Sequence, residues 1–145
     1  MKINIDQSNN YSEVEITIKC NNIDERLEKL ISSIRLYSST ISGKREDKIY
    51  FLKPEDVYYF DTVDEKVFIY TAHEVYETSL KLYELEERFA GTSIIRISKS
   101  TILNLMKIEY VSSLLNGRIE AVLQNGEKVI ISRQYVQAFK TKLGY

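Results

Sequence analysis

The sequence contains few of the residues that build disulfides, metal centres and phosphate-binding loops. It has one cysteine, Cys20, and one histidine, His73, so we expect neither an internal disulfide nor a metal site with cysteine and histidine ligands. Its five glycines are scattered through turns and form no phosphate-binding loop. The acids Asp61, Asp64 and Glu65 lie close together but lack the regular spacing and the distal glutamate of a calcium loop. We therefore expect a protein that is not an enzyme and that uses no cofactor and no metal ion.

Long apolar runs are also absent. No segment approaches the ~18 consecutive apolar residues of a membrane span, and residues 1–10 are too polar for a signal peptide. With 145 residues, of which 43% are hydrophobic, the chain has the size and composition of one globular domain with a short extension. We expect a soluble, cytoplasmic protein that does not insert directly into a membrane.

Positive charge is concentrated in the last third of the chain, although the formal net charge is −1. Residues 1–95 contain 12 lysines and arginines against 18 acids, whereas residues 96–145 contain 8 against 3. The stretch 94–104 contains Arg96 and Lys99 and no acid at all. This asymmetry indicates a surface that faces a polyanion, although an acidic protein partner would explain it equally well.

The first forty residues predict a strand followed by an amphipathic helix. Residues 13–20 alternate between apolar and polar side chains, which indicates a half-buried strand with Cys20 packed on its apolar face. Asn22, with Glu25 three residues later, resembles a capping box, and apolar residues then recur at helical spacing through about residue 37. One strand and one helix are too small a unit to be stable alone, so they should pack on the main domain or on a second copy.

Strand signals dominate after residue 48. The turn-rich residues 38–48 form the junction with the main domain, although their first part could pair as an edge strand. Runs of β-branched and aromatic residues predict four antiparallel strands at 48–52, 57–61, 66–71 and 75–79. Ser79 can then cap a short helix over 80–89, which ends at Gly91.

The pairs Asn116-Gly117 and Asn125-Gly126 are the clearest local signal in the sequence. Asn-Gly readily adopts the positive φ angles of a two-residue hairpin turn. The flanking segments 108–115, 118–124 and 127–132 should therefore form a three-stranded meander. A last helix from about 134 to 143 closes the chain, so the predicted fold class is mainly β with a few helices (α+β).

Four segments, in their order and spacing, resemble a LytTR domain, the domain of a family of bacterial DNA-binding transcription regulators. They are VYYFDT at 57–62, SLKLYELEE at 79–87, IRISKSTILN at 95–104 and NGEKVIISRQY at 125–135. The resemblance covers roughly residues 48–143. It implies an antiparallel β fold that inserts loops, and no recognition helix, into successive major grooves of repeated double-stranded DNA sites, with the protein acting as a homodimer.

The resemblance also places DNA contacts in three segments. These are Lys66 and Val67 before one strand, Lys99 and Ser100 in the stretch quoted above, and Ser132, Arg133 and Gln134 after the last strand.

The chemistry of these residues agrees with such contacts. Arg133 stands between an apolar strand and a helix, where a fixed backbone can aim its guanidinium at the two acceptors of guanine. Lys99 between two serines suits phosphate oxygens and occasional base edges. Val67 beside Lys66 suggests a thymine methyl contact or a phosphate contact. Arg96 alternates with isoleucines and could equally be a structural cation that pairs with an acid.

The resemblance divides the chain into a strand–helix extension at 1–43 and a LytTR-like DNA-binding domain at 44–145. Many members of this response-regulator-like family begin with a phosphorylated receiver domain, for which the residues before about 45 are too few. We expect the extension to serve dimerisation or the docking of a regulatory partner. The resemblance implies that this partner is a membrane-embedded protein.

Two other functions remain open from the sequence. One is a protein-interaction module whose basic end sequesters an acidic or membrane-embedded regulatory partner. The other is RNA binding, which would rest on the basic C-terminal third and the eleven tyrosines. Most of these tyrosines lie in strand patterns, where packing explains them.

Overall fold

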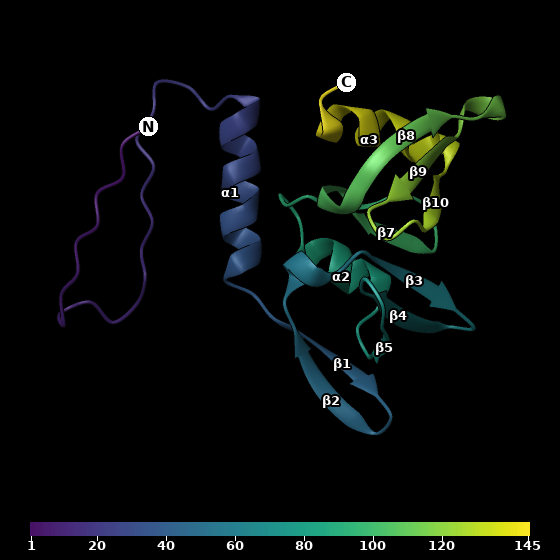
Figure 1. Cartoon of the computed structure of the whole chain (residues 1–145), viewed down its shortest axis with the longest axis horizontal. Coiled ribbons are helices and arrows are strands. Elements are labelled where there is room, and N and C mark those ends of the chain that lie inside the picture. The colour runs from purple at the N-terminus through teal and green to yellow at the C-terminus, as the bar shows by residue number, and fades with distance from the viewer.

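Two antiparallel β-sheets form the body of the protein (Figure 1). The computed structural model describes all 145 residues. The larger sheet has the strand order β2-β1-β5-β4-β3-β7-β6 and the smaller one the order β10-β9-β8. The strands are β1 (Ile41–Arg45), β2 (Lys48–Leu52), β3 (Tyr59–Val63), β4 (Lys66–Tyr70), β5 (Val75–Thr78), β6 (Ile94–Arg96), β7 (Thr101–Asn104), β8 (Ile108–Ser113), β9 (Ile119–Leu123) and β10 (Lys128–Ile131).

Three helices accompany the sheets, so the prediction of a mainly β fold with a few helices is confirmed. They are α1 (Glu25–Tyr37), α2 (Leu82–Arg88) and α3 (Val136–Leu143). Five strands separate α1 from α2, and five more separate α2 from α3. None of the helices combines the length and the hydropathy that crossing a bilayer would require.

The larger sheet has a separate hydrophobic core on each of its faces. On one face, Leu85 of α2 and Phe89, which follows that helix, pack with Ile102 of β7. On the other face, Leu103 packs with residues of the smaller sheet and with Phe139 of α3. Ile102 and Leu103 are neighbours that point to opposite faces, and both are fully buried. This strand therefore holds the two cores together.

The predicted three-stranded meander is confirmed, but neither of its turns has the two residues that the Asn-Gly pairs predict. In the first turn Asn116 and Gly117 have φ angles of 69° and 75°, and the Leu114 N–H donates to the Arg118 carbonyl at 2.9 Å across three residues. In the second turn only Gly126 has a positive φ, of 87°. There the Leu123 N–H donates to the Glu127 carbonyl at 2.8 Å, again across three residues.

Two further hairpins have tight turns that contain no glycine. Glu46-Asp47 joins β1 to β2 and Asp64-Glu65 joins β3 to β4, and all four residues have φ between 51° and 65°. The left-handed conformation costs a residue with a side chain roughly 1–2 kcal/mol, and the pairing of the flanking strands must offset this cost. The first part of residues 38–48 thus pairs as an edge hairpin.

Other element boundaries shift by two residues from those predicted. Pro54 starts a 3-10 turn, η1 (Pro54–Asp56), so β3 begins at Tyr59. Helix α2 begins after Lys81, whose N–H donates to Glu84 Oε1 at 3.2 Å. Ser79 is therefore not the cap.

The N-terminal extension departs most from the sequence prediction. Residues 14–20 are extended but belong to no strand, Glu13 lies in a bend, and Val14 is 90% exposed. Cys20 is exposed, so the predicted packed thiol is wrong. Asp24 caps α1, because its Oδ1 accepts a hydrogen bond from the Leu27 N–H at 2.8 Å. Residues 13–20 do alternate between apolar and polar side chains, but no other strand of the single chain lies beside them to form a sheet.

We predict that Asn104 is essential for stability. Its side chain is buried, donates from Nδ2 to the Val57 carbonyl at 2.8 Å and accepts from the Met106 N–H at 3.1 Å. Asn104→Ala should leave these groups unpaired and lower the free energy of unfolding by about 1–3 kcal/mol, measured by urea denaturation. As a control, Gln124→Ala removes an exposed hydrogen bond to Met106 and should change it by less than about 0.5 kcal/mol. Equal midpoints for the two variants would contradict this role.

Candidate nucleic-acid interface

The turn between β6 and β7 is hydrogen-bonded to both sheets. The Thr62 N–H of β3 donates to the Ser100 carbonyl at 2.9 Å. The Ser132 N–H, just after β10, donates to the Ile97 carbonyl at 2.9 Å. Two of the three predicted contact segments, one with Lys99 and one with Ser132, are thus direct neighbours in space.

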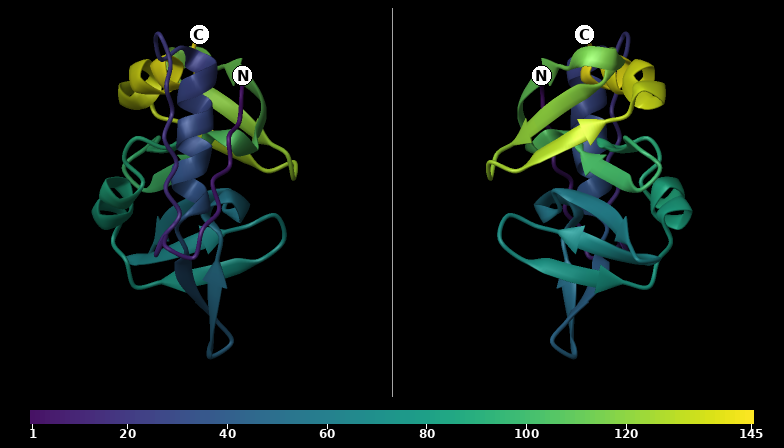
Figure 2. Two further views of the ribbon diagram at one scale, coloured as in Figure 1. Left: turned by 90° about the vertical axis from the view of Figure 1, so that its left-hand side faces the viewer. Right: turned by 90° about the vertical axis from the view of Figure 1, so that its right-hand side faces the viewer.

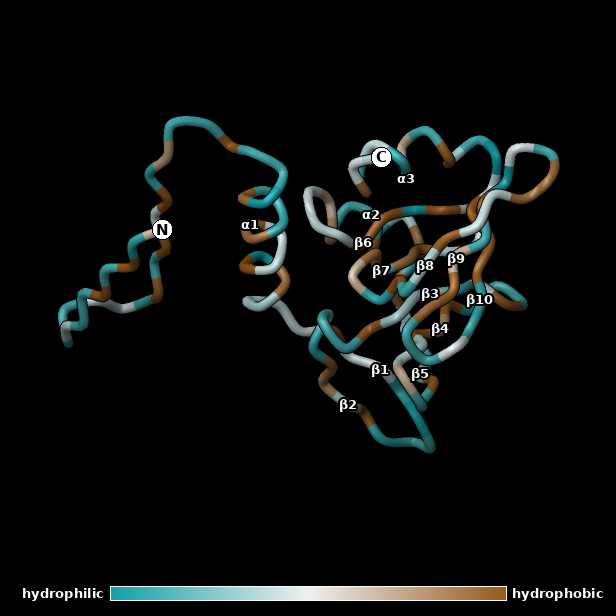
Figure 3. The backbone as a smooth tube through the Cα atoms, turned by 45° about the horizontal axis from the view of Figure 1, so that its top comes forward, coloured by the Kyte–Doolittle hydropathy of each residue, from teal (hydrophilic) through white to brown (hydrophobic).

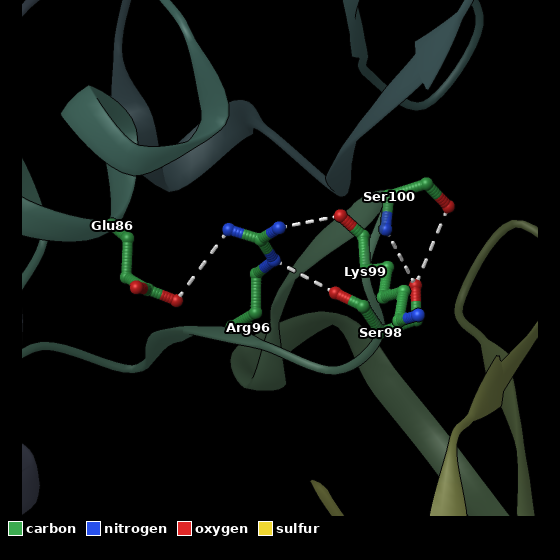
Figure 4. Close-up of polar contacts among 5 residues, drawn as sticks. All are labelled: Glu86, Arg96, Ser98, Lys99 and Ser100. Carbon is green, nitrogen blue, oxygen red and sulfur yellow. Dashed lines mark hydrogen bonds and ion pairs between the residues drawn. The ribbon is translucent and has the colours of Figure 1, made fainter.

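Arg96 is half-buried and directs its guanidinium at the carbonyl groups of this turn (Figure 4). Its Nε donates to the Ser98 carbonyl at 2.7 Å, and its Nη2 donates to the Lys99 carbonyl at 2.5 Å. On the other side, Nη1 lies 3.8 Å from Glu86 Oε2 of α2. Of the two interpretations that the sequence left open for Arg96, the structural one is correct.

The hydroxyl groups of the turn form a short chain that ends on an acid. Ser98 Oγ lies 3.4 Å from Ser100 Oγ, and Ser100 Oγ lies 3.3 Å from Thr101 Oγ1. Thr101 Oγ1 donates to Asp61 Oδ1 at 3.0 Å. Lys99 takes no part in this chain, and its side chain is exposed. The turn therefore offers an available ammonium group beside oriented hydroxyls.

An open hollow of about 390 Å³ lies beside this turn, between the two sheets. Hydroxyl groups of Ser98, Ser100, Thr101 and Ser132 line it, together with the cations Arg118 and Lys128 and the acid Asp61. Arg118 and Lys128 were missed by the sequence reasoning. Both stand at strand starts next to the Asn-Gly turns, which is the one local signal that could have drawn attention to them.

The segment after β10 contains two exposed polar side chains. Arg133 and Gln134 lie in the 3-10 turn η4 (Arg133–Tyr135), and both are exposed, whereas Ser132 is half-buried. The aliphatic part of Arg133 crosses the first Asn-Gly turn, since a Cβ on Gly117 would lie 3.2 Å from Arg133 Cδ. The guanidinium therefore extends from a supported stem at the edge of the smaller sheet.

The first predicted segment requires a correction. Val67 is 4% exposed and packs in the core with Ile69, so it cannot present a methyl contact to a base. Lys66 is exposed at the tip of the β3–β4 hairpin, where it pairs with Val63. Because side chains two residues apart share a face, Lys66 lies on the same face of the sheet as Asp61, which lines the hollow.

Two tyrosines next to the hollow stack on each other. The rings of Tyr59 and Tyr70 stack with centroids 4.3 Å apart and an interplanar angle of 9°. Burial, followed by the nearby Glu127 carboxylate, raises the pKa of Tyr59 well above its usual value. Burial and Asp61 raise the pKa of Tyr70. Both phenols therefore stay neutral near pH 7, and packing accounts for this pair.

Comparisons with known proteins agree with this architecture. Residues 47–144 match the family model of the LytTr DNA-binding domain. The chain is similar to the sensory transduction protein LytT of Enterococcus faecalis, with 36% identity over 107 residues that cover 74% of this chain and 44% of that protein. The matched segment thus spans less than half the length of that relative.

A second relative and a solved structure extend the comparison. An uncharacterised HTH-type transcriptional regulator of Staphylococcus aureus strain NCTC 8325 is 29% identical over 145 residues, which cover 99% of this chain and 98% of that protein. The solved structure of a LytTr DNA-binding domain from Bacillus cereus shares the fold with a TM-score of 0.71 and 24% identity, covering 74% of this chain and 99% of that one.

We predict that Arg96 orders the turn that carries Lys99. Arg96→Met keeps the aliphatic stem but loses the two hydrogen bonds to turn carbonyls, each worth about 1.5–3 kcal/mol for a charged donor. Amide hydrogen exchange at Ser98 and Ser100 should accelerate by about tenfold or more. Arg88→Met is the matched control, because Arg88 bonds the Thr40 carbonyl elsewhere. Unchanged exchange at Ser100 in Arg96→Met would contradict the role.

Proposed function

This chain belongs to the LytTR family of DNA-binding domains, and from that premise we propose how it acts as a DNA-binding transcription regulator. We propose that it contacts double-stranded DNA through the loops around the hollow between its two sheets. The observation that carries this proposal is the β6–β7 turn, whose hydrogen bonds to both sheets bring Lys99 and Ser132 together. The family is one of DNA-binding domains and not of enzymes.

The cations around the hollow suit the DNA backbone. Lys99 is exposed beside oriented hydroxyls, Lys128 and Arg118 line the hollow, and Lys66 lies on the same face of the larger sheet. Ammonium and hydroxyl groups are common donors to phosphate oxygens and position a protein on the duplex without reading sequence. Affinity from such contacts falls steeply as salt concentration rises. We assign the backbone contacts to these residues, with Ser100 and Ser132 supplying hydroxyls.

Base reading falls to the segment after β10. Arg133 and Gln134 are exposed at the end of the smaller sheet, and the stem of Arg133 rests on the turn at Gly117. A guanidinium can pair bidentately with guanine, and a glutamine amide with adenine. A supported stem restricts the direction of the guanidinium and so favours one base position over its neighbours.

The order of elements favours loops over a helix as the part that enters the major groove. A helix-turn-helix needs two consecutive helices joined by a short turn, whereas five strands separate each helix from the next in this chain. Helix α2 also buries Leu82 and Leu85 in a core. We therefore propose that the loops enter successive major grooves of a repeated site.

We further propose that residues 44–145 form the DNA-binding domain and that residues 1–43 join two copies into a homodimer. Two domains held side by side would occupy two repeats of one site, and linking two contacts raises the combined affinity. If DNA binding fails, the apolar extension and basic face would instead indicate a module that sequesters an acidic or membrane-embedded protein.

We predict that Arg133 and Lys66 contribute differently to DNA binding. Fluorescence anisotropy would compare a duplex from the protein's own upstream region with a scrambled duplex at two salt concentrations. Arg133→Ala should reduce the preference for the native duplex by about 1–3 kcal/mol. Lys66→Ala should weaken both duplexes alike and lower the salt slope by about 1.

Lys53→Ala is the matched control, because this exposed lysine precedes η1, the turn that contacts α1. It should leave both affinities unchanged. If Arg133→Ala keeps the full preference, the assignment of base reading is wrong. If the wild-type protein binds neither duplex at low salt, the proposed function is wrong.

A further inference from the structure

Helix α1 has two apolar faces, and only one of them contacts the rest of the chain. On the docked face, Leu36 is 4% exposed, Ser32 is buried, and the Arg35 guanidinium beside them donates to the Gly91 carbonyl at 3.2 Å. At 100° per residue, a second stripe lies on the opposite side of the helix. Its helical members are Leu27, Leu30, Ile34 and Tyr37, and Ile23 continues the spacing just before the N-cap Asp24.

The second stripe is only partly covered in the single chain, where Leu27 and Ile34 are half-buried. Ile23, Leu30 and Tyr37 are 58%, 41% and 82% exposed. Figure 2 shows that only the two extended N-terminal segments run along this outer side of α1, away from the sheets. A surface helix normally turns its polar face to water, so this stripe lacks the layer that would cover it.

The N-terminal segments also expose apolar side chains that nothing in the single chain covers. Residues 13–20 alternate in hydropathy, as the colours of Figure 3 show, along a backbone that is extended after the bend at Glu13. Val14, Ile16 and Ile18 are 90%, 58% and 39% exposed. Residues 2–6 alternate in the same way and lead into this segment through a turn in which the Tyr11 N–H donates to the Ser8 carbonyl at 3.3 Å. No strand of the chain pairs with either segment.

We propose that a second copy of this chain completes the extension by pairing its residues 13–20 antiparallel to the first, about a two-fold axis at Ile16. In this register Ile16 lies opposite Ile16 of the second copy, and Val14 lies opposite Ile18. Glu13 lies opposite Lys19, so two opposite charges meet at each end. This inference deepens the proposed homodimer and rests on it.

The register follows from charge and apolar pairing. Closed two-fold interfaces use the same patch on both copies, and opposite charges across a pair of strands stabilise it, whereas like charges destabilise it. A shift by two residues in one direction would place Glu15 opposite Glu15. A shift by two in the other direction would move the axis to Thr17. It would still pair Glu15 with Lys19, but it would place Val14 opposite Cys20 and Glu13 opposite Asn21. Only the proposed register sets Val14, Ile16 and Ile18 opposite one another.

The pairing would also give the helix stripe its missing layer. With residues 2–6 as outer strands, two copies form a four-stranded sheet whose apolar face carries Ile3, Ile5, Val14, Ile16 and Ile18. A two-stranded hairpin alone is marginal, but a wider sheet with one apolar face packed on a helix is stable. The outer stripes of the two α1 helices supply that covering, and the face with Glu13 and Lys19 stays in water.

Charge reversal in the full-length chain tests the pairing. Sedimentation equilibrium of the wild-type protein without DNA should give a dimer. Glu13→Lys and Lys19→Glu should each raise the dimer dissociation constant by about tenfold, because two pairs per dimer become repulsive. The double variant Glu13→Lys/Lys19→Glu should restore the wild-type value. Insensitivity of the dimer to both single reversals would overturn the inference.

Disulfide trapping tests the register. In a Cys20→Ser background, Ile16→Cys should give a covalent dimer on oxidation, because the two Cβ atoms face each other across the axis. Val14→Cys is the matched control and should stay non-covalent, since its counterpart lies four residues further along the partner strand. A covalent dimer with Thr17→Cys but not with Ile16→Cys would overturn this register.

The two proposals fail separately. A wild-type monomer that still prefers its native duplex would overturn the pairing and leave the DNA-binding function intact. A wild-type dimer that binds no DNA would overturn the function and leave the pairing intact.

Discussion

Two backbone hydrogen bonds at one turn fix the geometry on which the function depends. The Ser100 carbonyl accepts from Thr62 of the larger sheet, and the Ile97 carbonyl accepts from Ser132 after the last strand of the smaller one. These bonds leave little freedom between the sheets at this edge, and Ile102 and Leu103 hold the cores on both faces behind it. The hollow and its cations are therefore features of a fixed junction and not of a loose loop.

The partners of each arginine separate structural cations from those available to a ligand. Arg96 is satisfied by two carbonyls of its own turn and by Glu86. Arg133 has no acid beside it, and only its aliphatic stem packs on a neighbour, Gly117. A half-buried guanidinium whose N–H groups already bond carbonyls and face a carboxylate is a poorer phosphate ligand than one with a supported stem and an open head. The position of an arginine in the sequence does not by itself show whether its guanidinium is used within the fold or is available to a ligand.

The sequence predicts the elements that depend on local signals and misses what depends on distant neighbours. The meander was predictable because its signals are local: Asn116-Gly117 favours a tight turn, and the alternating residues on either side favour strands. The segment 13–20 was predicted as a strand because its apolar and polar residues alternate. This pattern indicates that the segment pairs with another strand, but it does not identify the chain that provides that strand. Arg118 and Lys128 were missed because the hollow exists only where two sheets meet. Val67 was assigned by resemblance, although its alternation with Ile69 places it in the core.

Lysine acetylation footprinting tests the central claim most directly, because this chain has lysines on several sides. The full-length protein would be acetylated with and without a duplex from its own upstream region, and the modified positions read by mass spectrometry. The account predicts that DNA protects Lys66, Lys99 and Lys128 and leaves Lys53 and Lys81 as reactive as before. Protection of Lys53 and Lys81, with Lys99 and Lys128 unchanged, would show that DNA binds elsewhere and would contradict the account.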